Sequence, residues 1–354
     1  MAKIEKIHII GGGVAGLAVG YFAHKHFPHA KVNIYEASKN LGGRCQTFYS
    51  HKLGIELDNA THVILGCNTY ARQFLEHVDF IRTPYFYDMN NKKVDATRFS
   101  HSELLLRSVF NTNGKSVDWQ CKLNLCLKLF PYFPHQLQIF YSQHNLQKTL
   151  ISALRDTDAN IYNNMCLRDI KVNSNKIEKL IFTHKDIDVA KNDIIISALD
   201  AHNYHKIFGG VEFDYNRIVN IFYRTSQKLA LPNNANMLGL ENADFDWLFV
   251  TDNTIGVTLS NVDKQLCCDD TWAINLWKQI CHIRNVQPAF IPSFQILDYP
   301  RATIAQDTKN NRKRPQSAQG QYKNLFIAGD WTMKNWPCCI EGAIASAHRA
   351  VKSI

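Results

Sequence analysis

A glycine-rich segment near the start of the chain constrains the fold more than any other feature. The residues KIEKIHIIGGGVAGLAVGYFAHKHF, from Lys3 onward, predict a strand, a tight turn and a helix. Gly11, Gly13 and Gly16 fit the spacing G-x-G-x-x-G. In that spacing the first glycine permits the turn, the second lets the backbone approach a diphosphate, and the third lets the helix pack close to the strand.

The next strand gives these glycines their context. KVNIYE ends at Glu36, which follows Gly16 by 20 residues and occupies the position of the acid that accepts a hydrogen bond from a ribose hydroxyl. A strand, a glycine turn, a helix and a strand that ends in an acid indicate a Rossmann-like dinucleotide site. The predicted contacts extend to Val14 and Ala15 at the start of the helix and to Ala37 after the acid.

A second glycine pair distinguishes between NAD and FAD. In NLGGRC, Gly42 and Gly43 form another close turn, and Arg44 adds a forked cation that suits a diphosphate. A Rossmann start followed by E-x(5)-G-G-R resembles the flavin amine oxidase and carotenoid desaturase superfamily. The resemblance implies FAD, which we expect to be bound noncovalently.

The end of the chain extends this resemblance. In the superfamily a Gly-Asp pair holds the ribityl-phosphate part of FAD, and Gly329 and Asp330 match that pair. Pro337 can open a helix because its φ suits the first turn, and the small residues that follow it predict a thin helix. The resemblance implies that this helix directs the backbone N–H near Ile340 at the flavin, where reduction adds negative charge.

The order of predicted elements indicates an α/β fold with a discontinuous first domain. Residues 1–65, 145–200 and 295–354 are predicted to form a Rossmann-like FAD-binding domain of the glutathione-reductase type. Residues 66–144 and 201–294 are rich in Phe, Tyr, Trp and Leu and are predicted to form an inserted mixed α+β substrate domain. A second G-x-G-x-x-G does not occur in the sequence, which argues against a separate NAD(P)H domain.

Four further motifs narrow the family. They are LDNATHVILGCNTY (57–70), NMLGLENADFDWLFV (236–250), YPRATIAQD (299–307) and LFIAGDWTMKNWPCCIEGAIAS (325–346). Together, and in this order, they resemble hydroxysqualene dehydroxylase, a family also called squalene-associated FAD-dependent desaturase. The resemblance implies an oxidoreductase of squalene and hopanoid biosynthesis that replaces an allylic hydroxyl with hydrogen by way of flavin N5.

The same resemblance assigns residues to the two ends of FAD. It implies that Glu36, Gly43 and Arg44 hold the adenosine and the diphosphate. Leu167 matches a position whose backbone contacts adenine, and Asp330 matches the acid that binds the ribityl chain.

One segment is expected beside the flavin ring. Asp58, Asn59 and His62 match the family's Asp-Asn-Gly-Gln-His, whereas Ala60 and Thr61 replace the glycine and the glutamine. These two replacements narrow the space near the ring and leave the identity of the substrate open. His62 is the preferred general acid, with Asp58 as the second candidate, and the alternative for His62 is a hydrogen-bonded histidine that shapes the loop.

Aromatic and thiol side chains near the expected flavin have two interpretations each. Trp247, Trp331 and Trp336 are predicted to line an apolar substrate pocket, the alternative being plain core packing. Cys338 and Cys339 lie at a predicted helix N-terminus, where a thiolate would be stabilised. The simpler interpretation is two inert thiols.

The net charge and the cysteine content limit the kinds of partner and metal site that we expect. The net charge is +9, which favours acidic partners, but the charge is scattered and we expect no nucleic acid. The one dense basic run, KNNRKRP at 309–315, is predicted to be a solvated loop. With ten cysteines but no CxxC pair, we expect free thiols in the cytoplasm and no metal site. The expected partners are an apolar small molecule, an unidentified electron donor and, by peripheral contact, the inner face of the cell membrane.

Two other functions remain open at this point. One is a flavin-dependent amine oxidase of the same fold. The other is a non-catalytic FAD-binding protein that contacts a partner through its basic surface.

Overall fold

The structure is a computed structural model that describes most of the chain. The described residues are 3–60, 62–75, 81–82, 85–90, 93–96, 102–129, 139–141, 146–288 and 290–354. Thr61, one of the predicted flavin contacts, lies outside them.

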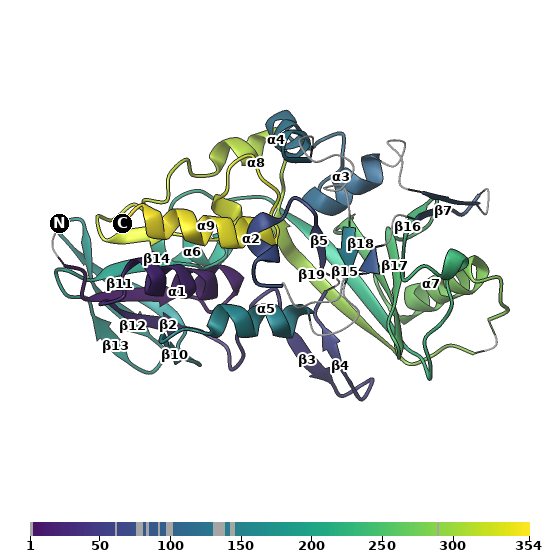
Figure 1. Ribbon diagram of the computed structural model, residues 1–354, viewed down its shortest axis with the longest axis horizontal. Coiled ribbons are helices and arrows are strands. Elements are labelled where there is room, and N and C mark those ends of the chain that lie inside the picture. The colour runs from purple at the N-terminus through teal and green to yellow at the C-terminus, as the bar shows by residue number, and fades with distance from the viewer. Residues whose placement is uncertain are drawn as a thin grey trace.

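A five-stranded parallel sheet forms one end of the molecule (Figure 1). Its strand order is β10-β2-β1-β14-β20, so that it joins three separate parts of the chain. Parallel strands covered on both faces are expected to be rich in Val and Ile, as IIIS in β14 illustrates. The strands are β1 Lys6–Ile10, β2 Lys31–Tyr35, β10 Asn160–Tyr162, β14 Ile194–Ser197 and β20 Leu325–Ile327.

Both faces of this sheet are covered. Helices α1 (Val14–His26), α5 (Leu146–Arg155) and α9 (Ile340–Lys352) share one apolar cluster with the sheet. On the other face, residues of the sheet pack with a three-stranded antiparallel sheet and helix α6 (Ala201–Phe208). That second sheet comprises β11 Leu167–Asn173, β12 Lys176–Phe182 and β13 Asp186–Asp188. This layered arrangement confirms the predicted α/β fold with a Rossmann-like sheet.

A seven-stranded sheet forms the opposite end, in the order β19-β15-β18-β17-β16-β7-β8. Helix α7 (Asp270–Ile283) packs against it, and the residues between them form a second large apolar cluster. The strands are β7 Tyr85–Asp88, β8 Lys93–Ala96, β15 Tyr215–Arg224, β16 Met237–Glu241, β17 Trp247–Val250, β18 Thr254–Val262 and β19 Phe294–Ile304.

Strand β19 corrects one predicted boundary. The sequence predicts that residues from 295 onward belong to the FAD-binding domain, but β19 pairs with β15 along nearly its whole length. The chain therefore returns to the first domain only after Ile304. Strand β19 is the edge strand of the larger sheet and pairs there with β15 alone.

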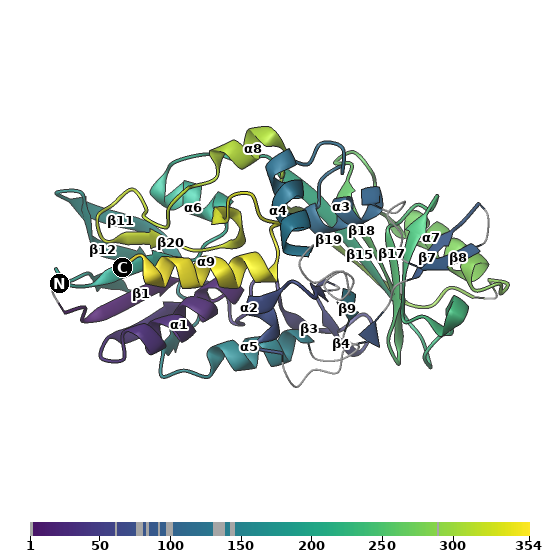
Figure 2. The ribbon, with the colours of Figure 1, turned by 45° about the horizontal axis from the view of Figure 1, so that its top comes forward.

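Short elements connect the two ends. The strands among them are β3 Thr47–Ser50, β4 Ile55–Asp58, β5 Val63–Leu65, β6 Ile81–Arg82 and β9 Ile139–Tyr141. The helices are α2 Thr69–Arg72, α3 Ser102–Phe110, α4 Trp119–Leu129 and α8 Thr308–Lys313, with 3-10 turns at Pro232–Asn234 and Asp330–Thr332. Figure 2 shows α4 and α8 side by side above the junction between the two sheets. None of the described helices is both long enough and apolar enough to cross a membrane.

Candidate functional site

The first glycine turn has the geometry that its spacing predicts. Gly11 has a φ of +105°, and its N–H donates to the Tyr35 carbonyl oxygen at 2.8 Å. A Cβ atom on Gly16 would lie 1.9 Å from the Gly11 carbonyl oxygen, which no side chain can tolerate. A Cβ on Gly13, by contrast, would meet protein atoms only at 3.8 Å and beyond. Space therefore remains beside Gly13, where the spacing predicts a diphosphate.

The start of α1 is open to a ligand. Gly13 is its N-cap residue and provides no side-chain hydrogen bond, and no acidic residue lies in the first turn. The backbone N–H groups at Val14 and Ala15 belong to the four that an α-helix leaves without an internal partner at its start. An uncapped helix N-terminus carries partial positive charge and suits a phosphate.

Glu36 organises the neighbouring loop. Its carboxylate oxygens accept hydrogen bonds from the N–H group of Gly12 at 2.7 Å and from that of Ser38, the residue after Ala37, at 2.8 Å. Each carboxylate oxygen has a further lone pair for a ribose hydroxyl. The Glu36 carbonyl accepts from the Met165 N–H at 2.8 Å, which brings the segment leading to Leu167 alongside.

The second glycine pair lies against the first. The Gly42 N–H donates to the Gly12 carbonyl at 2.9 Å, and both Gly42 and Gly43 have positive φ. A Cβ on Gly42 would lie 2.3 Å from the Cys45 carbonyl oxygen. The two predicted loops thus form one continuous surface of backbone.

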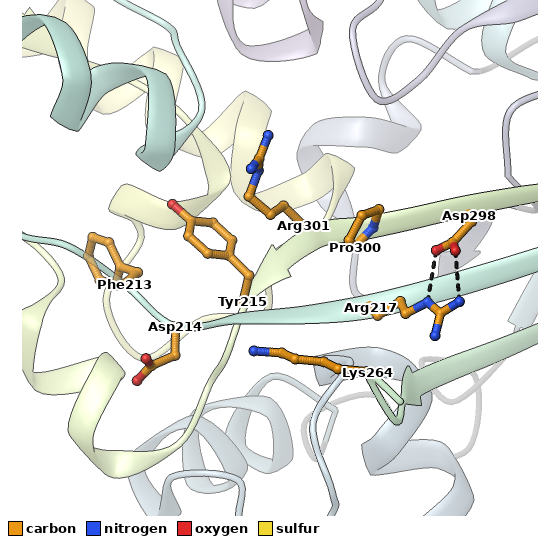
Figure 3. A pocket seen from close by; sticks show the side chains of 8 residues that line it. All are labelled: Phe213, Asp214, Tyr215, Arg217, Lys264, Asp298, Pro300 and Arg301. Carbon is orange, nitrogen blue, oxygen red and sulfur yellow. Dashed lines mark hydrogen bonds and ion pairs between the residues drawn. The ribbon is translucent and has the colours of Figure 1, made fainter. Parts of the chain in front are cut away.

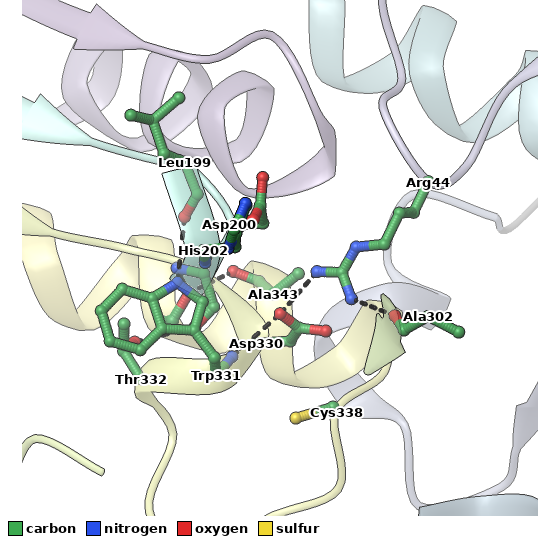
Figure 4. A network of polar contacts seen from close by, with 12 residues as sticks. Arg44, Leu199, Asp200, His202, Ala302, Asp330, Trp331, Thr332, Cys338 and Ala343 are labelled. Atoms are coloured by element: carbon green, nitrogen blue, oxygen red, sulfur yellow. Dashed lines mark hydrogen bonds and ion pairs between the residues drawn. The ribbon is translucent and has the colours of Figure 1, made fainter. Parts of the chain in front are cut away.

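Arg44 forms an ion pair with Asp330 (Figure 4). The Arg44 Nη2 to Asp330 Oδ1 distance is 2.7 Å, and Arg44 Nη1 also donates to the Ala302 carbonyl at 2.8 Å. Asp330 is buried, whereas the Arg44 side chain is 48 % exposed. The negative charge of Asp330 raises the pKa of Arg44. The sequence analysis gave Arg44 to a diphosphate, and the structure shows that it also has protein partners.

Arg314 holds the loop that carries Asp330, and the sequence analysis missed it. Its buried guanidinium donates to the carbonyls of Asp330 at 2.6 Å, Trp331 at 2.9 Å and Trp336 at 2.8 Å. The prediction of a solvated loop at 309–315 is therefore wrong. Residues Thr308–Lys313 form α8, and Asn310, Asn311 and Arg314 are buried. No sequence signal distinguishes this cation from its exposed neighbours.

The last helix begins later than predicted. Helix α9 starts at Ile340 with Cys339 as an N-cap that makes no side-chain hydrogen bond, so Pro337 precedes the helix by three residues. A Cβ on Gly342 would lie 2.8 Å from the Pro337 carbonyl oxygen, which explains why the helix must be thin there. Burial raises the pKa of Cys338 to about 12, so this thiol stays protonated and uncharged.

Asn59 and His62 lie beside the Arg44 loop. Asn59 and Gln46 are joined by hydrogen bonds in both directions, at 2.9 Å and 3.2 Å. The Ala60 carbonyl accepts from Gln147 Nε2 at 3.1 Å. Asp58 accepts from the Thr47 hydroxyl at 2.5 Å, and burial raises the pKa of the Asp58 carboxyl.

His62 differs from the imidazolium that a general acid requires. Burial lowers its pKa to about 4, against a smaller opposite effect of a hydrogen bond with the Arg44 backbone. The ring is therefore neutral near pH 7. Its Nε2 atom is buried and has no hydrogen-bond partner among the described residues.

The three predicted pocket tryptophans do not lie together. Trp247 is buried among apolar residues of the larger sheet, and its Nε1 donates to the Ser108 hydroxyl at 2.5 Å. Trp331 is buried in another cluster, and its Nε1 donates to the Leu199 carbonyl at 2.9 Å. These two residues are core tryptophans, which is the alternative that the sequence left open. Trp336 is different because its buried Nε1 has no partner among the described residues.

An open cavity of about 500 Å³ lies at the ends of β15 and β19 (Figure 3). Arg217 makes a two-pronged ion pair with Asp298 there, at 2.8 Å and 2.7 Å. Tyr215 and Arg301 extend to the same side of the two strands. The lining residues are Phe213, Asp214, Tyr215, Arg217, Lys264, Asp298, Pro300 and Arg301. This lining is too polar to be the predicted apolar pocket.

Comparisons with known proteins agree with the fold and the loops. A family described as NAD(P)-binding Rossmann-like domain matches residues 9–78, and one described as flavin containing amine oxidoreductase matches residues 286–354. Hydroxysqualene dehydroxylase of Zymomonas mobilis is 26% identical over 97% of both chains. That of Rhodopseudomonas palustris is 23% identical, over 98% of this chain and 97% of the relative.

The chain is an oxidoreductase. Its two family matches contain the glycine turns and the Asp330 loop, and they support a flavin as its cofactor. Solved structures share the fold of this oxidoreductase at low identity. A putative protoporphyrinogen oxidase from Exiguobacterium sp. 255-15 has a TM-score of 0.70 at 12% identity, covering 99% of this chain and 98% of that one. A putrescine oxidase has a TM-score of 0.65 at 10% identity, covering 99% and 98%.

Proposed function

We propose that this oxidoreductase binds FAD noncovalently and reduces an apolar allylic alcohol of the hydroxysqualene class. The observation that carries the proposal is the similarity to two hydroxysqualene dehydroxylases along almost the whole chain. It is supported by the position of the matching motifs, since His62 of segment 57–70 and Ala302 of segment 299–307 both form hydrogen bonds with Arg44.

The described residues fit FAD. The N-terminus of α1 is uncapped, and the backbone beside Gly13 is open to close approach. Glu36 has free lone pairs for a ribose, and Asp330 Oδ2 has no hydrogen-bond partner among the described residues, so it can accept from a ribityl hydroxyl. The orphaned buried Nε1 of Trp336 is a further polar atom awaiting a partner near the start of α9. When bound and reduced, FAD supplies a hydride.

The chain must then supply a proton. Replacement of a hydroxyl by hydrogen consumes one hydride and one proton and releases water, and hydroxide is a poor leaving group unless it is protonated as the C–O bond breaks. Burial raises the pKa of Asp58 and lowers that of His62. Because the raised pKa favours the protonated carboxyl that a general acid needs, we propose Asp58 for this role, and we propose that His62, as a neutral ring, donates a single hydrogen bond.

Product analysis tests the proposal. The FAD-loaded protein, reduced chemically and given hydroxysqualene, is expected to form squalene, as measured by mass spectrometry. Asp58→Asn should lower the rate by about 10²–10⁴, and His62→Gln should lower it less. Flavin content, measured for each variant, shows whether a loss of rate is a loss of cofactor. A larger effect of His62→Gln than of Asp58→Asn would return the acid role to His62.

A further inference from the structure

Helix α4 presents an apolar stripe to solvent. Trp119 is 63 % exposed, Leu123 46 % and Leu127 59 %. These residues are spaced by four, so they lie on one face of the helix. Large apolar side chains that gather on one exposed face, rather than occurring singly, indicate an interaction surface.

The opposite face of α4 is fixed in the protein. Cys121 and Leu125 are buried and pack with Phe110 and Val117 in a small apolar cluster. The helix therefore already has a face packed in the protein, and the exposed stripe is a second apolar face that lies in solvent.

The same helix rests on the loop of the candidate active site. Asn124 Nδ2 donates to the Asn335 carbonyl at 3.3 Å, and Asn335 is next to Trp336. The Asn311 side chain donates to Asp118, just before α4, at 3.0 Å and to Asn335 Oδ1 at 2.7 Å. Whatever binds the stripe is therefore brought close to the loop that begins at Asp330.

The charge around the stripe is positive. Helix α4 has the sequence WQCKLNLCLKL, which contains two lysines and no acid. Lys122 lies beside the stripe and Lys128 in the last turn, and neighbouring α8 carries the exposed Arg312. Figure 1 shows α4 at the top edge of the molecule next to α8, and in Figure 2, with that top turned forward, α4 lies in front of the junction between the two sheets. An indole with aliphatic neighbours and with basic residues such as Lys122 nearby matches the surface of an anionic bilayer.

We propose that α4 docks this protein on an anionic lipid bilayer through Trp119, Leu123 and Leu127. Docking on this face places the active-site loop at the membrane, where an apolar substrate is dissolved. Delivery of an apolar substrate to the active site rests on the proposed function, but the docking itself does not. The two are separable because vesicle binding needs no substrate.

Vesicle cosedimentation tests the surface. The wild type should bind vesicles of phosphatidylcholine and phosphatidylglycerol. The triple variant W119S/L123S/L127S should bind them about tenfold more weakly, or not at all. The matched control is F290S/I291S, which removes exposed apolar side chains, 72 % and 45 % exposed, in the loop after α7. This control should bind as the wild type does. Normal binding by the triple variant, or loss of binding in the control alone, would overturn the proposal.

Charge variants and the oligomeric state distinguish a lipid bilayer from a second copy of the chain as the partner of α4. K122E/K128E should weaken binding to the anionic vesicles by about tenfold and should remove most of its dependence on salt. Light scattering of the wild type and the triple variant should give the same mass. A wild-type dimer that the triple variant loses would show that a second copy covers α4, and it would overturn docking on lipid. Activity on detergent-dispersed substrate should be the same in the triple variant and the wild type, so a loss of activity there would count against the docking role.

Discussion

The guanidinium of Arg314 donates a hydrogen bond of 2.6 Å to the backbone carbonyl oxygen of Asp330, whose carboxylate accepts another of 2.7 Å from Arg44. One arginine thus positions the backbone of this residue and another its side chain. Asp330 is the residue expected to bind the ribityl chain, so its position decides whether the cofactor fits. Arg314 is buried, whereas the Arg44 side chain is half-exposed.

Replacement of Arg314 should therefore affect both stability and cofactor binding. Arg314→Met leaves three buried carbonyls without their donor, and we expect a loss of about 3 kcal/mol or more in the free energy of unfolding. Arg314→Lys can restore only part of the arrangement, because an ammonium lacks the planar fork. Urea denaturation and flavin content measure the two effects. Arg312→Met, at an exposed position two residues earlier in α8, is the control, and an equal loss in that variant would contradict the role of Arg314.

Alanine substitutions at two glycines should have different effects, one on folding and the other on cofactor binding. Gly16→Ala places a Cβ 1.9 Å from the Gly11 carbonyl, so we expect the turn to break and little folded protein to form. Gly13→Ala has a permitted φ of −74° and no close contact, so it should fold with a stability within about 1 kcal/mol of the wild type. It should nevertheless bind FAD weakly, because the new methyl occupies the open side of the turn. Full FAD occupancy in folded Gly13→Ala would contradict a diphosphate at this point.

The neutral His62 should make stability depend on pH. Its pKa in the folded protein, about 4, is below the ordinary value of 6.5. Between these values the unfolded chain binds more protons, so the stability due to neutral His62 is present above about pH 6.5 and is lost as the pH falls toward 4. When the pH falls from about 7.5 to about 5, the free energy of unfolding should decrease in both proteins. The decrease should be about 2 kcal/mol smaller in His62→Gln than in the wild type. Parallel pH profiles from urea denaturation would show that His62 is not buried as a neutral ring.

Arg44 should contribute moderately to FAD affinity. Arg44→Ala removes a half-exposed cation and one partner of Asp330, and we expect FAD to bind about 10- to 100-fold more weakly. Wild-type protein should be yellow and should release free FAD when it is denatured with acid. Flavin that stays with the precipitated chain would show a covalent bond. Unchanged affinity in Arg44→Ala would remove this residue from the cofactor site.

Local spacing accounts for what the sequence predicts well. The glycine turns, the acid after β2 and the strands of the parallel sheet each depend on a few consecutive residues with a fixed geometric role. Gly16 illustrates this, since its spacing from Gly11 specifies a contact that admits no side chain. Such constraints are visible without knowledge of the rest of the chain.

The failures have long-range causes. Arg314 and Arg312 are alike in the sequence, and only contacts with residues 330–338 make one buried and the other exposed. The indoles of Trp247 and Trp331 find internal hydrogen-bond partners, Ser108 and Leu199, that no local pattern reveals. The pKa of His62 depends on burial, which spacing does not encode.

Stopped-flow reoxidation of the reduced protein tests the central claim most directly. The FAD-loaded protein is reduced without oxygen and mixed with hydroxysqualene, with putrescine or with buffer. We predict that hydroxysqualene alone restores the absorbance of oxidised flavin, and that squalene forms in equal amount. Reduced flavin that persists with hydroxysqualene would contradict the account. So would reduction of the oxidised protein by putrescine in a separate anaerobic mixing experiment.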